Sequence, residues 1–173
     1  MKRPFTMAGV LMAAATACTL GTMVRAQDTP GSVSAMDKNF AVDAAHGGAA
    51  EVKLGELAAK QGSNAHVKEF GQKMVEDHTK ANDALKTVAT SKGITLPEEP
   101  NAEQKATMAH LMKLHGAAFD KAYIKAMKAD HKMDIAHFKK EANTGKDPDI
   151  KSFAAKTLPV VQGHYQMLMG MKM

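Results

Sequence analysis

Cysteine, tryptophan and arginine are almost absent from this sequence. Of 173 residues, one is cysteine and none is tryptophan. The single cysteine, Cys18, lies close to the N-terminus. Residues 27–173 can therefore form no disulfide, no zinc–thiolate site and no cysteine nucleophile.

The scarcity of arginine excludes a further class of protein. Lys2, Arg3 and Arg25 are three of the 23 basic residues, which leaves 20 lysines against 18 acidic residues beyond position 26. Nucleic-acid binding normally uses arginine for bidentate contacts and a strongly basic surface. We therefore expect no nucleic-acid partner, and the sequence identifies no protein partner.

Residues 1–26 have the pattern of a secretory signal peptide. Lys2 and Arg3 precede an apolar stretch from Phe5 to about Leu20, and Val24-Arg25-Ala26 offers small residues at the cleavage positions. We expect export to the periplasm or cell envelope, with no transmembrane span after processing. The alternatives are a retained membrane anchor and lipidation at Cys18.

After a flexible leader at 27–36, the sequence predicts one all-α domain over residues 37–173. Helix-forming residues dominate, and glycine and proline fall at boundaries. Gly62 is expected as a left-handed helix cap, Asn101 and Gln104 resemble a capping box, and Asp147 precedes a proline suited to a first helical turn. The expected helices are 37–61, 64–92, 101–114, 117–143 and 148–170.

The third of these helices favours one topology over another. A continuous helix from Asn101 to Asn143 would be about 64 Å long, much longer than its neighbours. A break near His115-Gly116 makes 101–114 a short crossing helix that returns the chain along the bundle. We therefore predict a ferritin-like four-helix bundle, with a plain up-down-up-down bundle as the alternative.

Each of the four long helices has one polar residue in its apolar stripe. These residues are Glu51, His78, His131 and His164. The helical rise places all four near the middle of the bundle, where they can share one layer. Buried imidazoles and carboxylates are costly unless they are paired or bound to metal.

The stripe residues therefore predict a polar site that binds a transition metal ion such as Zn, Cu or Fe. Asp77 and Asp130, each next to a histidine, are candidates to orient a ligand or to face water. The alternative is a metal-free structural or interaction module whose polar layer forms hydrogen bonds only.

A di-iron oxidoreductase fits less well. That pattern needs Glu-x-x-His on two helices, but Val75 and Val161 stand three residues before His78 and His164. Asp134-x-x-His137 is an acid-x-x-His pair, and it lies on a face that the sequence indicates is mixed or solvated. We expect metal handling or envelope stress tolerance rather than catalysis.

Methionine suggests a second kind of metal site at the C-terminus. Met167, Met169, Met171 and Met173 offer soft thioethers suited to Cu(I) or Ag(I). The alternative is that these residues fill gaps in the helix packing.

Two hairpins also resemble each other. Val67-Lys68-Glu69-Phe70 opens one helix much as Ile150-Lys151-Ser152-Phe153 opens another. A duplicated ancestor or chance similarity between amphipathic helices would explain this.

Several runs resemble a bacterial family, domain of unknown function 4142. They are Ala49–Ala58, Met74–Asn82, Gly116–Ile124, Asp130-His131 and Ile150–His164. The resemblance covers about residues 36–168 and leaves out the methionine-rich tail. It implies an exported, ferritin-like helical bundle, and it brings no established activity.

Overall fold

The structure is a computed structural model that describes residues 33–171, and this part of the chain is all-α. It contains five helices and no strand. Their bounds are α1 Ala35–Gln61, α2 Ala65–Ser91, α3 Ala102–Leu111, α4 Gly116–Thr144 and α5 Pro148–Gly170.

The first helix begins earlier than the sequence predicts. Ser34 is its N-cap, and the Ser34 side chain accepts a hydrogen bond from the Asp37 backbone N–H. The expected flexible leader at 27–36 is therefore wrong at its C-terminal end, because capping extends the helix to Ala35. Residues 27–32 and the predicted signal peptide at 1–26 lie outside the described residues.

The end of α1 also differs from expectation. Gly62 has φ −54° and ψ 138°, so it is not a left-handed cap. A Cβ at this position would lie 2.7 Å from the Ala58 carbonyl oxygen. Close backbone contact, rather than a left-handed conformation, explains glycine here.

The short helix α3 ends at Leu111 instead of the expected residue 114. Its start has the predicted capping box, in which Asn101 and Gln104 bond each other's backbone N–H groups. At its end, the Gln61 side-chain amide donates to the carbonyls of Leu111 and Leu114. Residues between Leu111 and Gly116 are not helical, so one continuous helix from 101 to 143 is wrong.

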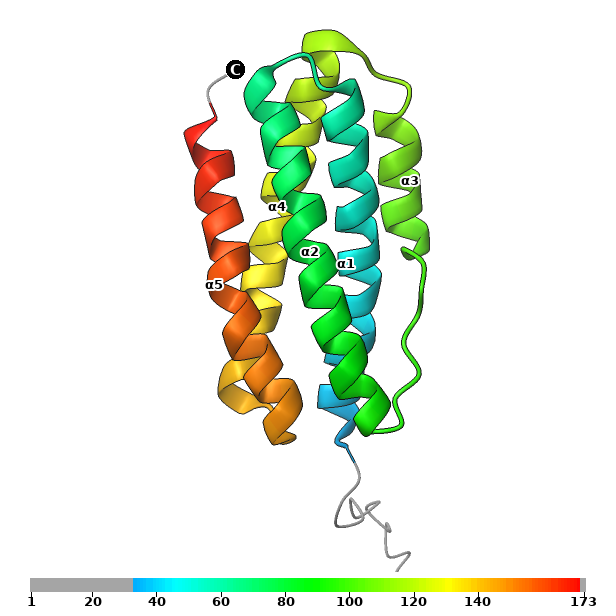
Figure 1. Ribbon diagram of the computed structural model, residues 1–173, viewed down its shortest axis with the longest axis vertical. Helices are drawn as coiled ribbons and strands as arrows, with labels where there is room; N and C mark the ends of the chain where they lie inside the picture. The colour runs from blue at the N-terminus through cyan, green and yellow to red at the C-terminus, as the bar shows by residue number, and fades with distance from the viewer. Residues whose placement is uncertain (1–32, 172–173) are drawn as a thin grey trace, which may run out of the picture.

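Figure 1 shows how the helices are arranged. Antiparallel α1 and α2 form one hairpin, and antiparallel α4 and α5 form another. Between the hairpins, the chain returns along the length of the bundle through α3, which packs on α1 and α4. The extended part of this connection is fixed to α1, where His46 and Lys53 donate to Glu99 at 2.6 Å each.

The first hairpin is tightly packed at one pair of glycines. A Cβ added to Gly55 would lie 2.7 Å from the Gly71 carbonyl oxygen, and one added to Gly71 would lie 2.6 Å from that of Gly55. Neither position has room for a side chain. This contact sets the close approach of α1 to α2.

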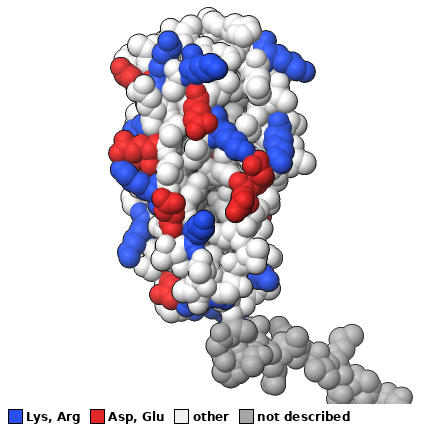
Figure 2. Space-filling model, turned by 45° about the vertical axis from the view of Figure 1, so that its right-hand side comes forward, with Lys and Arg blue, Asp and Glu red and all other residues white. Residues whose placement is uncertain are grey.

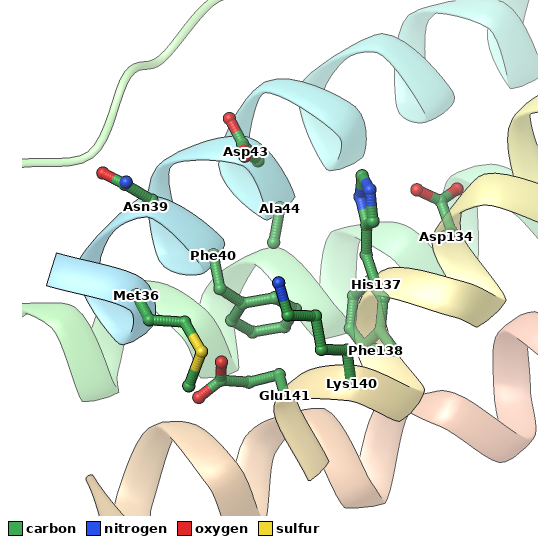
Figure 3. Close-up of a pocket in the computed structure, with 10 residues that line it drawn as sticks. All are labelled: Met36, Asn39, Phe40, Asp43, Ala44, Asp134, His137, Phe138, Lys140 and Glu141. Atoms are coloured by element: carbon green, nitrogen blue, oxygen red, sulfur yellow. The ribbon is translucent and has the colours of Figure 1, made fainter. Parts of the chain in front are cut away.

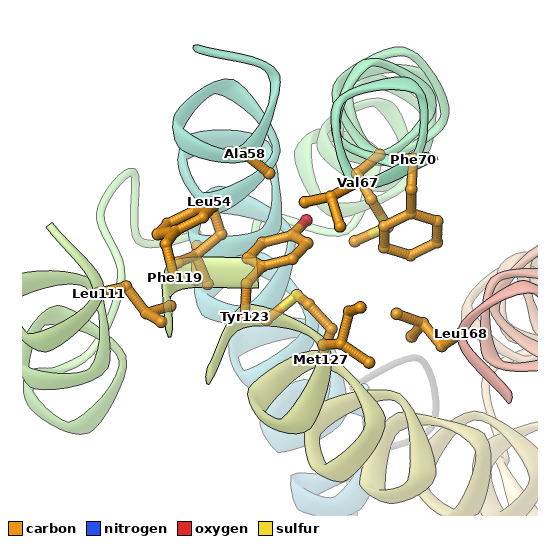
Figure 4. Packing of buried hydrophobic residues seen from close by; sticks show 12 residues of the cluster. Leu54, Ala58, Val67, Phe70, Leu111, Phe119, Tyr123, Met127 and Leu168 are labelled. Carbon is orange, nitrogen blue, oxygen red and sulfur yellow. The ribbon is translucent and has the colours of Figure 1, made fainter. Parts of the chain in front are cut away.

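Two apolar clusters fill the bundle on either side of a polar layer. The first is built around Phe70, Phe119 and Tyr123, and the rings of Phe119 and Tyr123 stack with centroids 5.7 Å apart (Figure 4). The second is built around Phe40 and Phe138, in edge contact at 5.1 Å. In α2, α4 and α5, residues of the two clusters flank one buried histidine: Met74 and Leu85 around His78, Met127 and Phe138 around His131, and Ala154 and Leu168 around His164.

Each hairpin turn is held by an aspartate of the other hairpin. The buried Asp37 carboxylate of α1 accepts the backbone N–H groups of Lys146 and Asp147, both at 3.0 Å. The buried Asp120 carboxylate of α4 accepts those of Ser63 and Asn64 at 3.0 and 2.8 Å. Reciprocal caps therefore join the two hairpins at both ends.

The surface gives no sign of a single-charge region on the face in Figure 2, where basic and acidic side chains alternate. None of the helices between residues 33 and 171 combines the length and the apolar character needed to cross a membrane.

Glu141 generates a testable pH dependence. It is 2% exposed beside Asp37, and burial together with the Asp37 carboxylate raises its pKa from 4.5 to about 7. As pH rises through this interval, the unfolded chain releases a proton that the folded chain retains, so stability falls. Wild type therefore loses free energy of unfolding between pH 5 and pH 8. We expect Glu141→Gln to lose about 2–3 kcal/mol less than wild type over this interval.

Urea unfolding at the two pH values measures this difference. Glu56→Gln, which changes an exposed residue of α1, is the control and should follow the wild-type pH dependence. Parallel curves for Glu141→Gln and wild type would contradict the assignment.

Candidate functional site

The four predicted stripe residues meet in one buried layer, one from each long helix. Glu51 of α1 and His78 of α2 are each 4% exposed, His131 of α4 is fully buried and His164 of α5 is 1% exposed. The three imidazole centroids are 5.2 to 5.9 Å apart. The site lies where two apolar clusters exclude water from the bundle.

Each imidazole has one nitrogen bound to an oxygen at the periphery of the layer. His78 Nδ1 lies 2.8 Å from Glu51 Oε2, and His164 Nε2 lies 2.8 Å from Asp77 Oδ2. His131 Nδ1 lies 3.1 Å from the Met127 carbonyl oxygen. Because carboxylate and carbonyl oxygens accept, these three nitrogens donate.

The other nitrogens point toward one another. One nitrogen from each ring lies within 4.8 Å of the other two, and His78 Nε2 is 3.3 Å from His164 Nδ1. His131 Nε2 has no hydrogen-bond partner and stands 3.7 Å from Glu51 Oε1, which also has none. In neutral rings these inner nitrogens carry lone pairs, so the layer attracts a cation.

Charge is distributed unevenly over the layer. Burial raises the pKa of Glu51, but His78 and the other imidazoles outweigh burial and lower it to about 2. Burial lowers the pKa of His78, yet the Glu51 carboxylate outweighs burial and leaves that pKa raised. Burial lowers the pKa of His131 to about 4 and also lowers that of His164.

The raised pKa of His78 favours its protonated form when no metal is bound. The ring then donates to Glu51 and to His164 at the same time. Even when His78 is protonated, His131 Nε2 and Glu51 Oε1 are buried and have no hydrogen-bond partner. A single proton does not satisfy the layer.

The two flanking aspartates differ in role. Asp77 does not orient its neighbour His78; it bonds His164 and also pairs with Lys73 at 2.9 Å. Asp130 offers an oxygen to a second group that contains Glu51, His131 and Asp134, whose ligand atoms lie within 4.8 Å of one another. Burial and the Glu51 charge raise the pKa of Asp130 to about 7.

Asp134 is the residue that the sequence reading missed. Its Oδ2 is buried without a hydrogen-bond partner, and burial followed by the Glu51 charge raises its pKa well above 3.8. The expectation of a mixed face is confirmed, since Glu141 is 2% exposed whereas Asp130 and Asp134 are half-buried and His137 is exposed. The spacing of three residues after His131 is the signal that places Asp134 beside the site.

Two of the four tail methionines line one groove. Met167 and Met171 line a groove of about 650 Å³ together with His66. Met169 is 54% exposed and is not among the residues lining that groove. Met173 lies outside the described residues.

The comparisons with known proteins identify a family. The sequence profile described as "Domain of unknown function (DUF4142)" matches residues 22–171. The chain belongs to this family. The match extends beyond the resemblance at 36–168 and includes Met169 and Met171 of the tail. No curated protein has a significantly similar sequence.

A solved structure has the same fold as this DUF4142 protein. It is the crystal structure of a DUF305 fragment from Deinococcus radiodurans, with a TM-score of 0.71 and 12% sequence identity. The similarity covers 80% of this chain and 96% of that one. At this identity it supports the helical fold alone.

The lowered pKa of His131 predicts that the metal-free protein is less stable in acid. His131 has a pKa of 6.5 in the unfolded chain and of about 4 in the folded chain. Between these pH values the unfolded chain binds a proton at His131 and the folded chain does not, so stability falls as the pH falls. In the presence of a chelator, the free energy of unfolding falls between pH 7.5 and pH 5. We expect this fall to be about 2 kcal/mol smaller for His131→Leu than for wild type.

Denaturant unfolding at both pH values gives the measurement. His66→Gln is the matched control because His66 is exposed on α2. An identical loss of stability in His131→Leu and wild type would show that His131 does not titrate as proposed.

Proposed function

We propose that this protein binds a transition metal ion inside the helical bundle through His78, His131 and His164, with Glu51 as a fourth ligand. The observation that carries the proposal is that one nitrogen from each of the three buried imidazoles lies within 4.8 Å of the other two. In addition, His131 Nε2 stands 3.7 Å from Glu51 Oε1, and neither atom has a hydrogen-bond partner. A metal ion would satisfy all four atoms at once.

The distances support direct coordination. Tetrahedral ions with metal–nitrogen bonds of about 2.0–2.1 Å hold their ligand nitrogens about 3.3 Å apart. His78 Nε2 and His164 Nδ1 are 3.3 Å apart. Imidazole with one carboxylate suits Zn, Cu or Fe.

The surroundings of the rings support the same proposal. Metal-binding histidines usually donate their second nitrogen to a carboxylate or carbonyl, which fixes the ring and its tautomer. Glu51 Oε2, the Met127 carbonyl and Asp77 provide this support for His78, His131 and His164. Glu51 thus orients His78 with one oxygen and leaves the other for the ion.

The arrangement of helices fits a ferritin-like four-helix bundle. We infer this class from the order of two hairpins joined by a lengthwise return through α3 (Figure 1). That connection is characteristic of ferritin-like bundles and differs from an up-down-up-down bundle. Metal sites in such bundles lie between facing helices, as the four ligands do here.

The biological setting that we propose is the periplasm or cell envelope. This inference rests on the signal-like sequence at 1–26. The proposed role is metal handling or tolerance of envelope stress. No reaction is proposed, since valines stand where a di-iron site needs carboxylates on α2 and α5.

Metal retention tests the proposed function. Tag-free protein is stripped with a chelator, loaded with Zn(II), Cu(II) or Fe(II) and freed of excess metal. Wild type should retain at least one equivalent by elemental analysis, and His78→Ala or His131→Ala should lose it. At 100 times the dissociation constant, the ion should stabilise wild type by about 2.7 kcal/mol.

The exposed His66 provides the control, since His66→Ala should retain metal as wild type does. Equal retention by the His78 and His131 variants, or none by wild type, would reject the interior metal site. The metal-free structural module would then account for the layer.

A further inference from the structure

We propose that the bundle holds a second cation position, formed by the carboxylates of Glu51, Asp130 and Asp134 beside the imidazole position. The inference rests on the proposed function, because Glu51 is shared between the two positions. The centre would then hold two ions, one mainly with nitrogen ligands and one with oxygen ligands.

The geometry places the three carboxylates together on the α1–α4 side of the layer. One oxygen each from Glu51, Asp130 and Asp134 lies within 4.8 Å of the others and of a His131 nitrogen. Glu51 Oε1 and Asp134 Oδ2 are buried and have no hydrogen-bond partner. Glu51 is 4% exposed, so bulk solvent does not reach its oxygens.

Lysine does not neutralise this group. Within residues 33–171, the groups that act on the charges of Asp130 and Asp134 are carboxylates and His78. Carboxylates at this separation either share protons or bind a cation. A cation is the occupant that we propose here, in place of a proton shared between Asp134 and Glu51.

The size of the adjacent space limits the ligand. A cavity of about 20 Å³ lies against Glu51, His78 and Asp134, which is room for about one water molecule or ion. A position with three carboxylate oxygens, and one His131 nitrogen beside them, favours hard divalent cations. Mg²⁺ usually retains several waters, which so small a space does not admit, whereas carboxylate ligands also suit Mn²⁺.

A route from the surface reaches the same carboxylate. Asp134 lines both this cavity and an open groove of about 220 Å³ between α1 and α4. Figure 3 shows Asp134 and His137 on α4 across the groove from Asp43 on α1. This groove opens the Asp134 side of the layer to solvent.

Stoichiometry tests the second position with Zn(II) and Mn(II) as probes. Stripped, tag-free protein receives one equivalent of Zn(II) and then excess Mn(II), and native mass spectrometry counts the ions. Wild type should hold one Zn(II) and one Mn(II), and Mn(II) should show an immobilised electron paramagnetic resonance signal. Asp134→Asn should keep Zn(II) and bind Mn(II) at least tenfold more weakly.

The variants separate failure of this inference from failure of the proposed function. Asp83→Asn, at an exposed site on α2, should behave as wild type. Asp130→Asn repeats the test if Asp134→Asn does not fold. One Zn(II) and no Mn(II) in wild type would overturn the second position alone, whereas no bound ion of either kind would overturn both.

Discussion

The contact between Glu51 and His78 is the interaction on which the interior of this bundle depends. Both side chains are about 95% buried, and their 2.8 Å contact joins α1 to α2 in the middle of an apolar core. A buried ion pair rarely stabilises a fold more than apolar residues of similar volume. Its presence between two apolar clusters therefore points to a role other than stability. We propose that this role is to bind a cation together with the inner nitrogens of His78, His131 and His164.

The polar layer separates two apolar clusters, one toward each end of the bundle. Each apolar cluster packs on its own side of the histidines, and each end is closed by an aspartate that caps the opposite hairpin. Asp37 and Asp120 thus hold the hairpins in register without any contribution from the layer. The helices can then present costly polar groups at a fixed height, which a preformed binding site requires.

Helix positions and stripe residues were predictable because both follow from periodicity and local capping. Glu51, His78, His131 and His164 interrupt apolar stripes, and the helical rise alone places them at one height. Asp134 was not predictable in this way, since its burial depends on how α4 packs against α1. The end of α3 depends similarly on a long-range contact, from Gln61 to the Leu111 carbonyl.

The two hairpins match at several carboxylates and glycines and differ at the three buried histidines. The spacing from Asp37 to Glu51 and Gly62 equals that from Asp120 to Asp134 and Gly145, and Gly62 and Gly145 share one extended conformation. In the same register His78, His131 and His164 correspond to Val161, Gly48 and Ala81. Paired carboxylates therefore follow the repeat, whereas the imidazoles break it. In the proposed metal centre, carboxylates that follow the repeat and imidazoles that do not would form two unlike positions between nearly equivalent helices.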